Sequence, residues 1–139
     1  MVVDSYTFNL RTRQEGEMVD ITDQVQDLIG KARPVNGVAF LFVPGSTGAL
    51  TTIEYESGLI SDFSAILDRL VPKGIRYEHE KRWHDGNGHS HVRASLLGPD
   101  LAVPFKGKKL LLGTWQQIVF VELDVRPRER TIVVQLIGD

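Results

Sequence analysis

The chain has 139 residues and a formal net charge of −2, which is the size of one domain with a single core. The small charge does not predict nucleic acid or a membrane surface as a partner, and no apolar run approaches the roughly 20 residues that span a bilayer. The absence of cysteine excludes disulfides, Cys-ligated zinc and thiol nucleophiles. The N-terminus has no secretory signal pattern, so we expect a cytoplasmic protein.

The first half of the chain begins with two strands and a helix. Residues 5–13 alternate apolar and polar side chains, as a half-buried strand does, and residues 18–21 predict a short second strand. Thr22 is expected to cap a helix that ends at Pro34. Residues 38–43 form a continuous apolar run, which is typical of a strand buried on both faces.

A glycine-rich turn over residues 44–48 follows this strand. Its backbone N–H groups could hold an anion, and a plain connection between strands is the alternative. A further strand over residues 49–54 then leads to a second helix. The apolar side chains of that helix, between Leu59 and Leu70, fall on one face.

Four strand-like runs make up most of the second half: residues 101–105, 109–112, 115–124 and 131–137. The connections between these runs have the length of hairpin loops. Strands with helices interspersed, followed by strands alone, predict an α+β fold. We therefore expect one compact domain over residues 1–139, with mixed or antiparallel β-sheets and two main helices.

All four histidines lie in one charged stretch, residues 77–99. Neutral imidazole is the commonest protein ligand for divalent transition metals. We predict a divalent-metal site with His79, His89 and His91 as ligands, because three protein ligands are the pattern of a catalytic zinc site. Zinc is the expected ion, and magnesium is the alternative with a pyrophosphate substrate. His84 is expected to be exposed, and a solvated loop without metal is the alternative for the whole stretch.

The sequence does not decide whether the segment around His89 and His91 is a strand or a helix. In a strand the two imidazoles share a face, whereas in a helix they diverge by about 200°. We favour a short helix that Gly98 and Pro99 end. In that case one of the two histidines faces other ligands or a neighbouring subunit.

Three carboxylates are candidates for catalysis: Glu54, Asp62 and Glu122. The first two flank the turn before the second helix. Glu122 lies in an apolar strand, where an isolated buried charge is very costly, so we expect it to be buried and paired. Its structural partner would be Arg128 or Arg130, and orienting a metal-bound imidazole is a further alternative.

Three residues have side chains suited to a flat, phosphorylated substrate. Trp115 and Gln116 could stack on and hydrogen-bond a planar ring such as a pyrimidine, and packing of the indole in the core is the alternative. Arg128 could bind phosphate in bidentate fashion, and a solvated turn is the alternative.

These motifs together resemble the YjbQ-like family, which is linked to a secondary thiamine-phosphate synthase activity. The resemblance covers nearly the whole chain and rests on residues 45–54, 77–79, 87–98 and 112–116, followed by Glu122 and Arg128. It implies a compact α+β fold, a homotrimer and a metal-capable histidine cluster. Many relatives carry a histidine where this chain has Gly45. Thr51 and Ser95 lie within the shared motifs, and we expect both to bind substrate.

We expect a metal-assisted transferase that acts on small phosphorylated substrates, with thiamine phosphate formation as the case that the resemblance implies. The metal would neutralise a pyrophosphate leaving group. Two alternatives stay open: a non-catalytic trimeric protein that binds metal or ligand, and a metal-dependent hydrolase. The expected partners are a phosphorylated small molecule and further copies of the chain, with no nucleic acid and no membrane.

Overall fold

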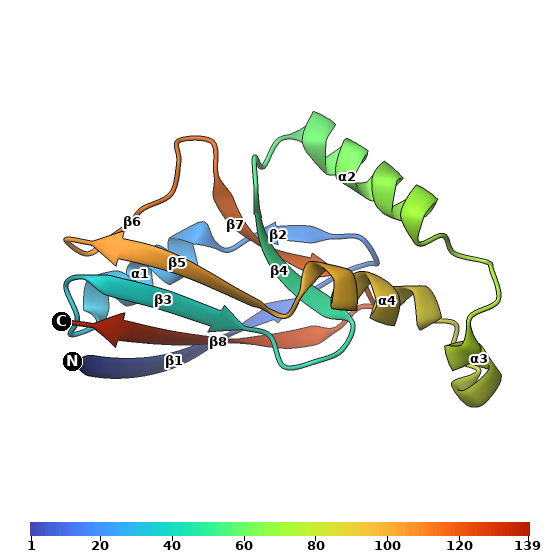
Figure 1. Ribbon diagram of the computed structural model, residues 1–139, viewed down its shortest axis with the longest axis horizontal. Coiled ribbons are helices and arrows are strands. Elements are labelled where there is room, and N and C mark those ends of the chain that lie inside the picture. The colour runs from blue at the N-terminus through green and yellow to red at the C-terminus, as the bar shows by residue number, and fades with distance from the viewer.

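The computed structural model describes all of residues 1–139, whose eight strands form two antiparallel sheets (Figure 1). The larger sheet has the strand order β1 (Val2–Arg11), β8 (Glu129–Gly138), β3 (Gly37–Phe42), β5 (Asp100–Lys106) and β6 (Lys109–Leu110). The smaller sheet has the order β2 (Met18–Asp20), β7 (Gln117–Glu122) and β4 (Gly48–Ile53). This arrangement confirms the predicted α+β class with antiparallel sheets.

Four helices complete the fold: α1 (Thr22–Lys31), α2 (Ser57–Leu70), α3 (Glu78–Trp83) and α4 (Gly88–Leu97). The first two are the predicted main helices. The predicted short helix before Gly98 is α4, whereas α3 was not predicted. None of the four is long and apolar enough to cross a membrane.

The core has two parts, which lie on the two faces of the smaller sheet. The side chains of β7 contribute alternately to the two parts of the core, because successive side chains of a strand point to opposite faces. Ile118 and Phe120 pack against the larger sheet and α1, while Val119 and Val121 pack against α2 and α4. Glu122 continues the first series and therefore points between the two sheets, where charged groups need partners.

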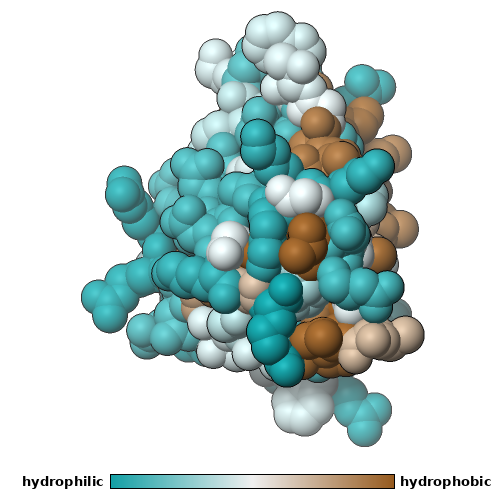
Figure 2. Space-filling model, turned by 90° about the vertical axis from the view of Figure 1, so that its left-hand side faces the viewer, coloured by the Kyte–Doolittle hydropathy of each residue, from teal (hydrophilic) through white to brown (hydrophobic).

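The outer face of the larger sheet has no cover, so the prediction that residues 38–43 are buried on both faces is wrong for the single chain. Strand β3 alternates, with Ala39 and Leu41 buried and Val38 and Phe42 exposed. Ile137 of β8 pairs with Val38 of β3 on one side and with Val3 of β1 on the other. Figure 2 shows hydrophobic side chains gathered along its right-hand edge. That edge is the side of the molecule that faces the viewer in Figure 1.

Thr22 does not cap α1 as predicted, because it is the first residue within the helix. Its hydroxyl instead donates to Asp20 at 2.7 Å and accepts the backbone N–H of Ile118 at 2.9 Å. The residue therefore ties the start of α1 to strand β7. A position one residue earlier would have been needed for the side chain to reach the free N–H groups of the first turn.

Candidate functional site

Helices α3 and α4 form a hairpin that brings the histidine stretch together. The turn between them needs left-handed backbone, which His84 (φ 55°) and Gly86 (φ 70°) supply. Helix α4 then begins at Gly88, whose N–H donates to the Glu80 carboxylate at 2.5 Å. A Cβ atom on Gly88 would lie 2.7 Å from Cβ of Tyr77, so the close approach of the two helices requires glycine there.

His79 of α3 and His91 of α4 face each other within this hairpin. Their ring centroids are 4.4 Å apart, and the ring planes are tilted by 38°. Nδ1 of His79 is buried and makes no hydrogen bond. The nearest carboxylate oxygen, on Asp85, is 3.4 Å away without hydrogen-bond geometry, and that of Glu80 is 3.9 Å away. A buried ring nitrogen without a partner is uncommon and indicates a ligand position.

The environment of His91 favours its neutral form. Partial burial is the main cause of its lowered pKa, and the imidazole of His79 lowers the pKa further. The carboxylates of Asp85, Asp124 and Glu80 act in the opposite direction without reversing the shift. A neutral imidazole is the form that binds a metal ion, so His91 is prepared for that role at neutral pH.

These side chains fit a divalent cation. The donor atoms of His79, Glu80 and Asp85 lie within 4.8 Å of one another, and the ring of His91 packs directly against that of His79. Asn87, with its amide nitrogen turned toward Asp85, donates to both carboxylate oxygens at 2.7 and 3.1 Å and would hold that carboxylate in place. We call His79, Asp85, Asn87 and His91 the histidine cluster.

A second polar cluster adjoins the histidine cluster, where the loop after β7 meets the glycine-rich turn. Asp124 accepts hydrogen bonds from Thr47 at 3.0 Å and from Nε of Arg128 at 2.9 Å. Burial raises the pKa of Asp124, but the hydrogen bonds from Arg128, Thr47 and the N–H of Val125 outweigh it, and the pKa is lowered overall. The carboxylate therefore stays ionised beside the histidines.

Glu122 and Arg130 form the buried centre of this second cluster. Glu122 is fully buried and accepts from Arg130 through both oxygens, at 2.9 and 2.5 Å. Thr12 donates to the same carboxylate at 2.9 Å, and Arg130 also donates to the Thr47 hydroxyl at 2.9 Å. The predicted burial and arginine pairing of Glu122 are confirmed. We call Thr12, Thr47, Glu122, Asp124, Arg128 and Arg130 the ion-pair cluster.

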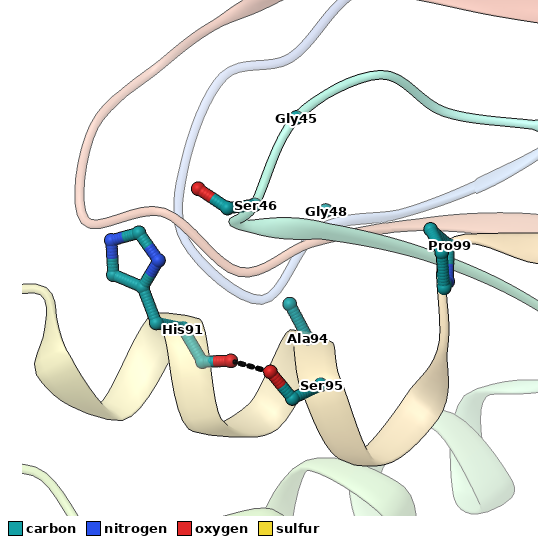
Figure 3. A pocket seen from close by; sticks show the side chains of 7 residues that line it. All are labelled: Gly45, Ser46, Gly48, His91, Ala94, Ser95 and Pro99. Atoms are coloured by element: carbon teal, nitrogen blue, oxygen red, sulfur yellow. Dashed lines mark hydrogen bonds between the residues drawn. The ribbon is translucent and has the colours of Figure 1, made fainter.

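Two small cavities flank these clusters. The first, of about 170 Å³, is lined by Gly45, Ser46, His91 and Ser95, among others. His91 points from α4 toward Ser46 of the glycine-rich turn, while Ser95 donates to the His91 carbonyl at 2.9 Å (Figure 3). Gly45 has φ +136°, and a Cβ there would lie 2.9 Å from the Arg130 guanidinium, so this turn is built for glycine.

The second cavity, of about 210 Å³, lies between the α3–α4 turn and the loop after β7. It is lined by Asp85, Asn87, Asp124, Val125, Arg126 and Arg128. Cationic guanidinium groups thus line the same cavity as Asp85 and Asn87 of the histidine cluster. This juxtaposition of cation ligands and anion-binding groups is the arrangement that a metal-bound phosphate would need.

Comparison with known proteins identifies the family of the chain. The family model described as "UPF0047 protein YjbQ-like" matches residues 6–139. The chain belongs to the YjbQ-like family. A UPF0047 protein of Archaeoglobus fulgidus is 39% identical over 126 residues, which cover 91% of this chain and 95% of the relative. A UPF0047 protein of Methanothermobacter thermautotrophicus is also 39% identical, over 99% of this chain and 94% of the relative.

Solved structures of the YjbQ-like family share the fold. A crystal structure from Sulfolobus solfataricus, described as a YbjQ-like protein of unknown function, has a TM-score of 0.89 and 34% identity, and covers 99% of this chain and 100% of that one. A hypothetical protein from Aeropyrum pernix has a TM-score of 0.84 and 32% identity over the full length of both chains. The fold is therefore shared across the family.

The third predicted ligand of the YjbQ-like chain, His89, lies apart from the other two. It is buried on α4, where Nε2 contacts the carboxylate of Glu15, and Lys73 contacts the same carboxylate at 2.8 Å. Burial raises the pKa of Glu15, but hydrogen bonds from Lys73 and His89 lower it overall. Side chains two residues apart on a helix point about 200° apart, so His89 and His91 face different partners. His84 is exposed, as predicted.

The predicted ring-binding residues, Trp115 and Gln116, lie at the Ile53 end of strand β4, whereas the His91 cavity lies at its Gly48 end. Trp115 and Gln116 line an open cavity of about 380 Å³ together with Glu54 and Thr52. Trp115 is 73% exposed, so the alternative of core packing is wrong. The first residue of β4 that lines this cavity is Thr52, four residues along the strand from Gly48 of the first cavity, which corresponds to about 14 Å.

The remaining predicted residues lie outside the two cavities next to the histidines. Asp62 is exposed on α2, and Thr51 is half-buried within β4. Sequence reasoning missed Asp85 and Asp124 as members of the site. The first was within reach, because Asp85 follows His84 in the same stretch. The second depends on the pairing of β7 with β4, which places the Glu122 end of β7 beside Gly48.

Proposed function

We propose that this chain is a metal-assisted transferase acting on small phosphorylated substrates, with thiamine phosphate formation as the specific reaction. The observation that carries the proposal is the buried, unpartnered Nδ1 of His79 beside Asp85, with Arg126 and Arg128 lining the adjoining cavity. The thiamine phosphate reaction itself comes from the family resemblance.

His79, His91 and Asp85 would hold the metal. Two imidazoles and one carboxylate suit zinc, which prefers nitrogen ligands, better than magnesium, which prefers oxygen and keeps most of its water. The metal would supply charge neutralisation at a pyrophosphate leaving group. His89 is replaced in this ligand set by Asp85, because Glu15 already occupies the His89 ring nitrogen.

The chain's own residues would bind and orient the phosphate groups. Arg126 is exposed at the rim of the cavity, and Arg128 is held by Asp124 so that its remaining N–H groups stay in place. The glycine-rich turn offers the Ser46 hydroxyl on the other side of His91. An arginine fixed by a carboxylate loses less conformational freedom when it binds phosphate than a free surface side chain does.

The proposal includes assembly as a homotrimer. The number of subunits comes from the family resemblance, and the contact surface comes from the uncovered face of the larger sheet. On that face Val3, Val38, Phe42 and Ile137 are between 37% and 50% exposed, and Ile137 pairs with both Val3 and Val38. A contiguous exposed apolar patch of this kind marks an interaction surface. Association would also bury β3 on both faces, as its apolar sequence predicts.

Metal analysis combined with an activity assay tests the proposal. Purified protein is expected to contain zinc and to join the thiazole phosphate with the pyrimidine pyrophosphate, and a chelator should abolish turnover. Bound metal without turnover would instead support a non-catalytic metal-binding protein. Protein that neither binds zinc nor turns over the two substrates would refute the proposed function.

Matched variants connect the result to the named residues. His79→Ala should lose both metal and turnover. The control is His84→Asn, which changes an exposed histidine of the same hairpin and keeps a residue that tolerates the left-handed backbone at this position. The control should retain metal and turnover.

A further inference from the structure

The cavity beside the glycine-rich turn differs from the other cavities of the molecule in its charge. Its wall contains the His91 imidazole, the hydroxyls of Ser46 and Ser95, and no carboxylate. Each of the four other cavities has at least one carboxylate in its wall, and the cavity next to the α3–α4 turn has two. An anion that enters the cavity beside the glycine-rich turn therefore meets no like charge in the wall.

The turn itself leaves hydrogen-bond donors free at this cavity. The N–H groups of Gly45 and Ser46 donate to no backbone or side-chain acceptor, and both residues are exposed in the cavity wall. The Ser46 hydroxyl also makes no hydrogen bond within the chain, whereas Ser95 donates to the carbonyl of His91. Backbone N–H groups in a turn that have no acceptor of their own can bind an anion together.

The open edge of strand β4 adds a further donor. The N–H of Leu50 donates to the carbonyl of Gly98 at the end of α4, at 3.1 Å, and not to the neighbouring strand β7. N–H groups two residues apart in a strand point to the same side. The N–H of Gly48 therefore points from the same edge of β4 toward α4, where the cavity lies.

A buried arginine lies next to the same glycines. Arg130 is 7% exposed, and its Nε and Nη2 atoms donate to Glu122 and Thr47. Its Nη1 atom makes no hydrogen bond and is not fully enclosed. Nη1 would lie 2.9 Å from a Cβ atom on Gly45, so the missing side chain leaves this nitrogen open beside the cavity. A guanidinium that a carboxylate fixes along one edge presents its other edge as an oriented donor for an oxyanion.

We propose that this cavity binds the phosphate of a phosphate monoester, through Nη1 of Arg130, the free N–H groups of the turn and the Ser46 hydroxyl. The cavity has a volume of about 170 Å³, whereas sites that enclose a drug-sized ligand have roughly 300–1,000 Å³. It therefore suits a terminal phosphate, with the rest of the ligand outside.

The inference deepens the proposed function and rests on it in one respect, the division of two phosphorylated groups between two cavities. The monoester binds at the glycine-rich turn, and the pyrophosphate binds at Arg126 and Arg128. His91, a proposed metal ligand, lines the first cavity, and Asp85, another, lines the second. Both groups would thus lie next to the metal site.

Inorganic phosphate tests the site without metal or substrate. It is added to isotope-labelled protein in the presence of a chelator, and the backbone amide signals are followed by NMR. The signals of Gly45 and Ser46 should shift and saturate, while chloride at equal ionic strength should leave them in place. Phenyl phosphate should shift the same signals, because the site holds only its phosphate. Shifts confined to Val125 and Arg126, or shifts with inorganic phosphate alone, would refute the monoester site.

A charged variant connects the shifts to the cavity. Ser46→Asp places a carboxylate in the wall at an exposed position and should weaken phosphate binding by about tenfold or more, because like charges repel. Ser64→Asp makes the same change of charge on the exposed surface of α2 and should leave phosphate binding unchanged. Circular dichroism checks that both variants fold. Equal weakening in the two variants would indicate a general charge effect and contradict the site.

The two proposals fail in different ways. Phosphate that binds at the turn of a protein without transferase activity would support the site and count against the proposed reaction. Turnover in a protein whose turn binds no phosphate would refute the site and leave the proposed function in place.

Discussion

The ion-pair cluster and the histidine cluster are neighbours, but they differ in how far their polar atoms are satisfied. Every charged group at the centre of the ion-pair cluster has a partner, and Glu122 accepts from three side-chain N–H or O–H groups. In the histidine cluster, Nδ1 of His79 is buried without a partner. Saturated groups have no capacity left for a ligand, whereas an unsatisfied buried group gains most from one.

The comparison assigns different roles to residues that the sequence offered as equal candidates. Glu122 was a catalytic candidate, but its contacts are those of a structural residue that fixes Arg130 and, through it, the turn at Thr47. His79 and His91 keep ring atoms available. We therefore expect substitutions in the first cluster to reduce stability and substitutions in the second to reduce ligand binding.

The largest effect is expected from Glu122→Ala. It leaves Arg130 buried without a counter-charge, and removing one partner of such a pair costs about 3–5 kcal/mol. Denaturant unfolding should show a correspondingly lower midpoint. Glu129→Ala is the control, because Glu129 pairs with Arg11 at 4.0 Å on the exposed surface and should cost about 1 kcal/mol or less. Equal losses in both variants would contradict the structural role of Glu122.

Zinc affinity should distinguish His91 of the histidine cluster from His89, which lies outside both clusters and contacts Glu15. His91→Ala should weaken zinc binding by about a hundredfold or more, since loss of a ligand exceeds the ten- to hundredfold loss typical of supporting residues. His89→Ala should leave zinc affinity unchanged and instead lower stability by about 1–3 kcal/mol, because it removes a buried partner of Glu15. Calorimetric titration and unfolding of both variants measure the two effects. Loss of zinc binding in His89→Ala would restore the original ligand set.

A smaller effect is expected at Thr47, whose hydroxyl joins the two ion pairs of the buried cluster. Thr47→Val removes the hydrogen bonds to Arg130 and Asp124 at nearly constant volume and should cost about 1–3 kcal/mol. Thr47→Ser keeps the hydroxyl and should recover most of that loss. If Thr47→Ser unfolds as early as Thr47→Val, the methyl group rather than the hydroxyl carries the stability.

The fold was largely predictable because apolar periodicity follows the local backbone. Strands and the two long helices follow from that signal, and β7 shows it clearly in its alternation between two cores. Two features could not be predicted from apolar periodicity. Helix α3 has six residues and no buried side chain, so it leaves no apolar pattern. The exposed face of β3 carries apolar residues that no other part of the chain covers.

The candidate site was predictable only where its residues are close in sequence. His79 and His91 belong to one stretch, and the α3–α4 turn is short enough to bring them together. Asp124 approaches them through the pairing of β7 with β4, which no local pattern reveals. Trp115 was grouped with the histidines by chemistry, yet strand length separates them in one chain.

The smallest expected effect concerns the pH dependence of stability at His91. Burial and the neighbouring His79 lower the pKa of His91 in the folded state, while the unfolded chain titrates near the ordinary value of about 6.5. As pH falls through about 6.5, the unfolded state takes up this proton before the folded state does. Stability that is present above pH 6.5 is therefore lost as the solution becomes acidic.

Urea unfolding with a chelator present measures this loss without interference from metal. The native chain should lose stability between pH 8 and pH 5, and His91→Gln should lose less because its side chain does not titrate. The carboxylates with lowered pKa values, at Asp4, Glu15 and Asp124, act below this window, because their unfolded pKa values lie near 4. Identical pH slopes in the native chain and in His91→Gln would show that His91 has no unfavourable protonation in the folded state. The contrast between a saturated and an unsaturated cluster would then rest on His79 alone.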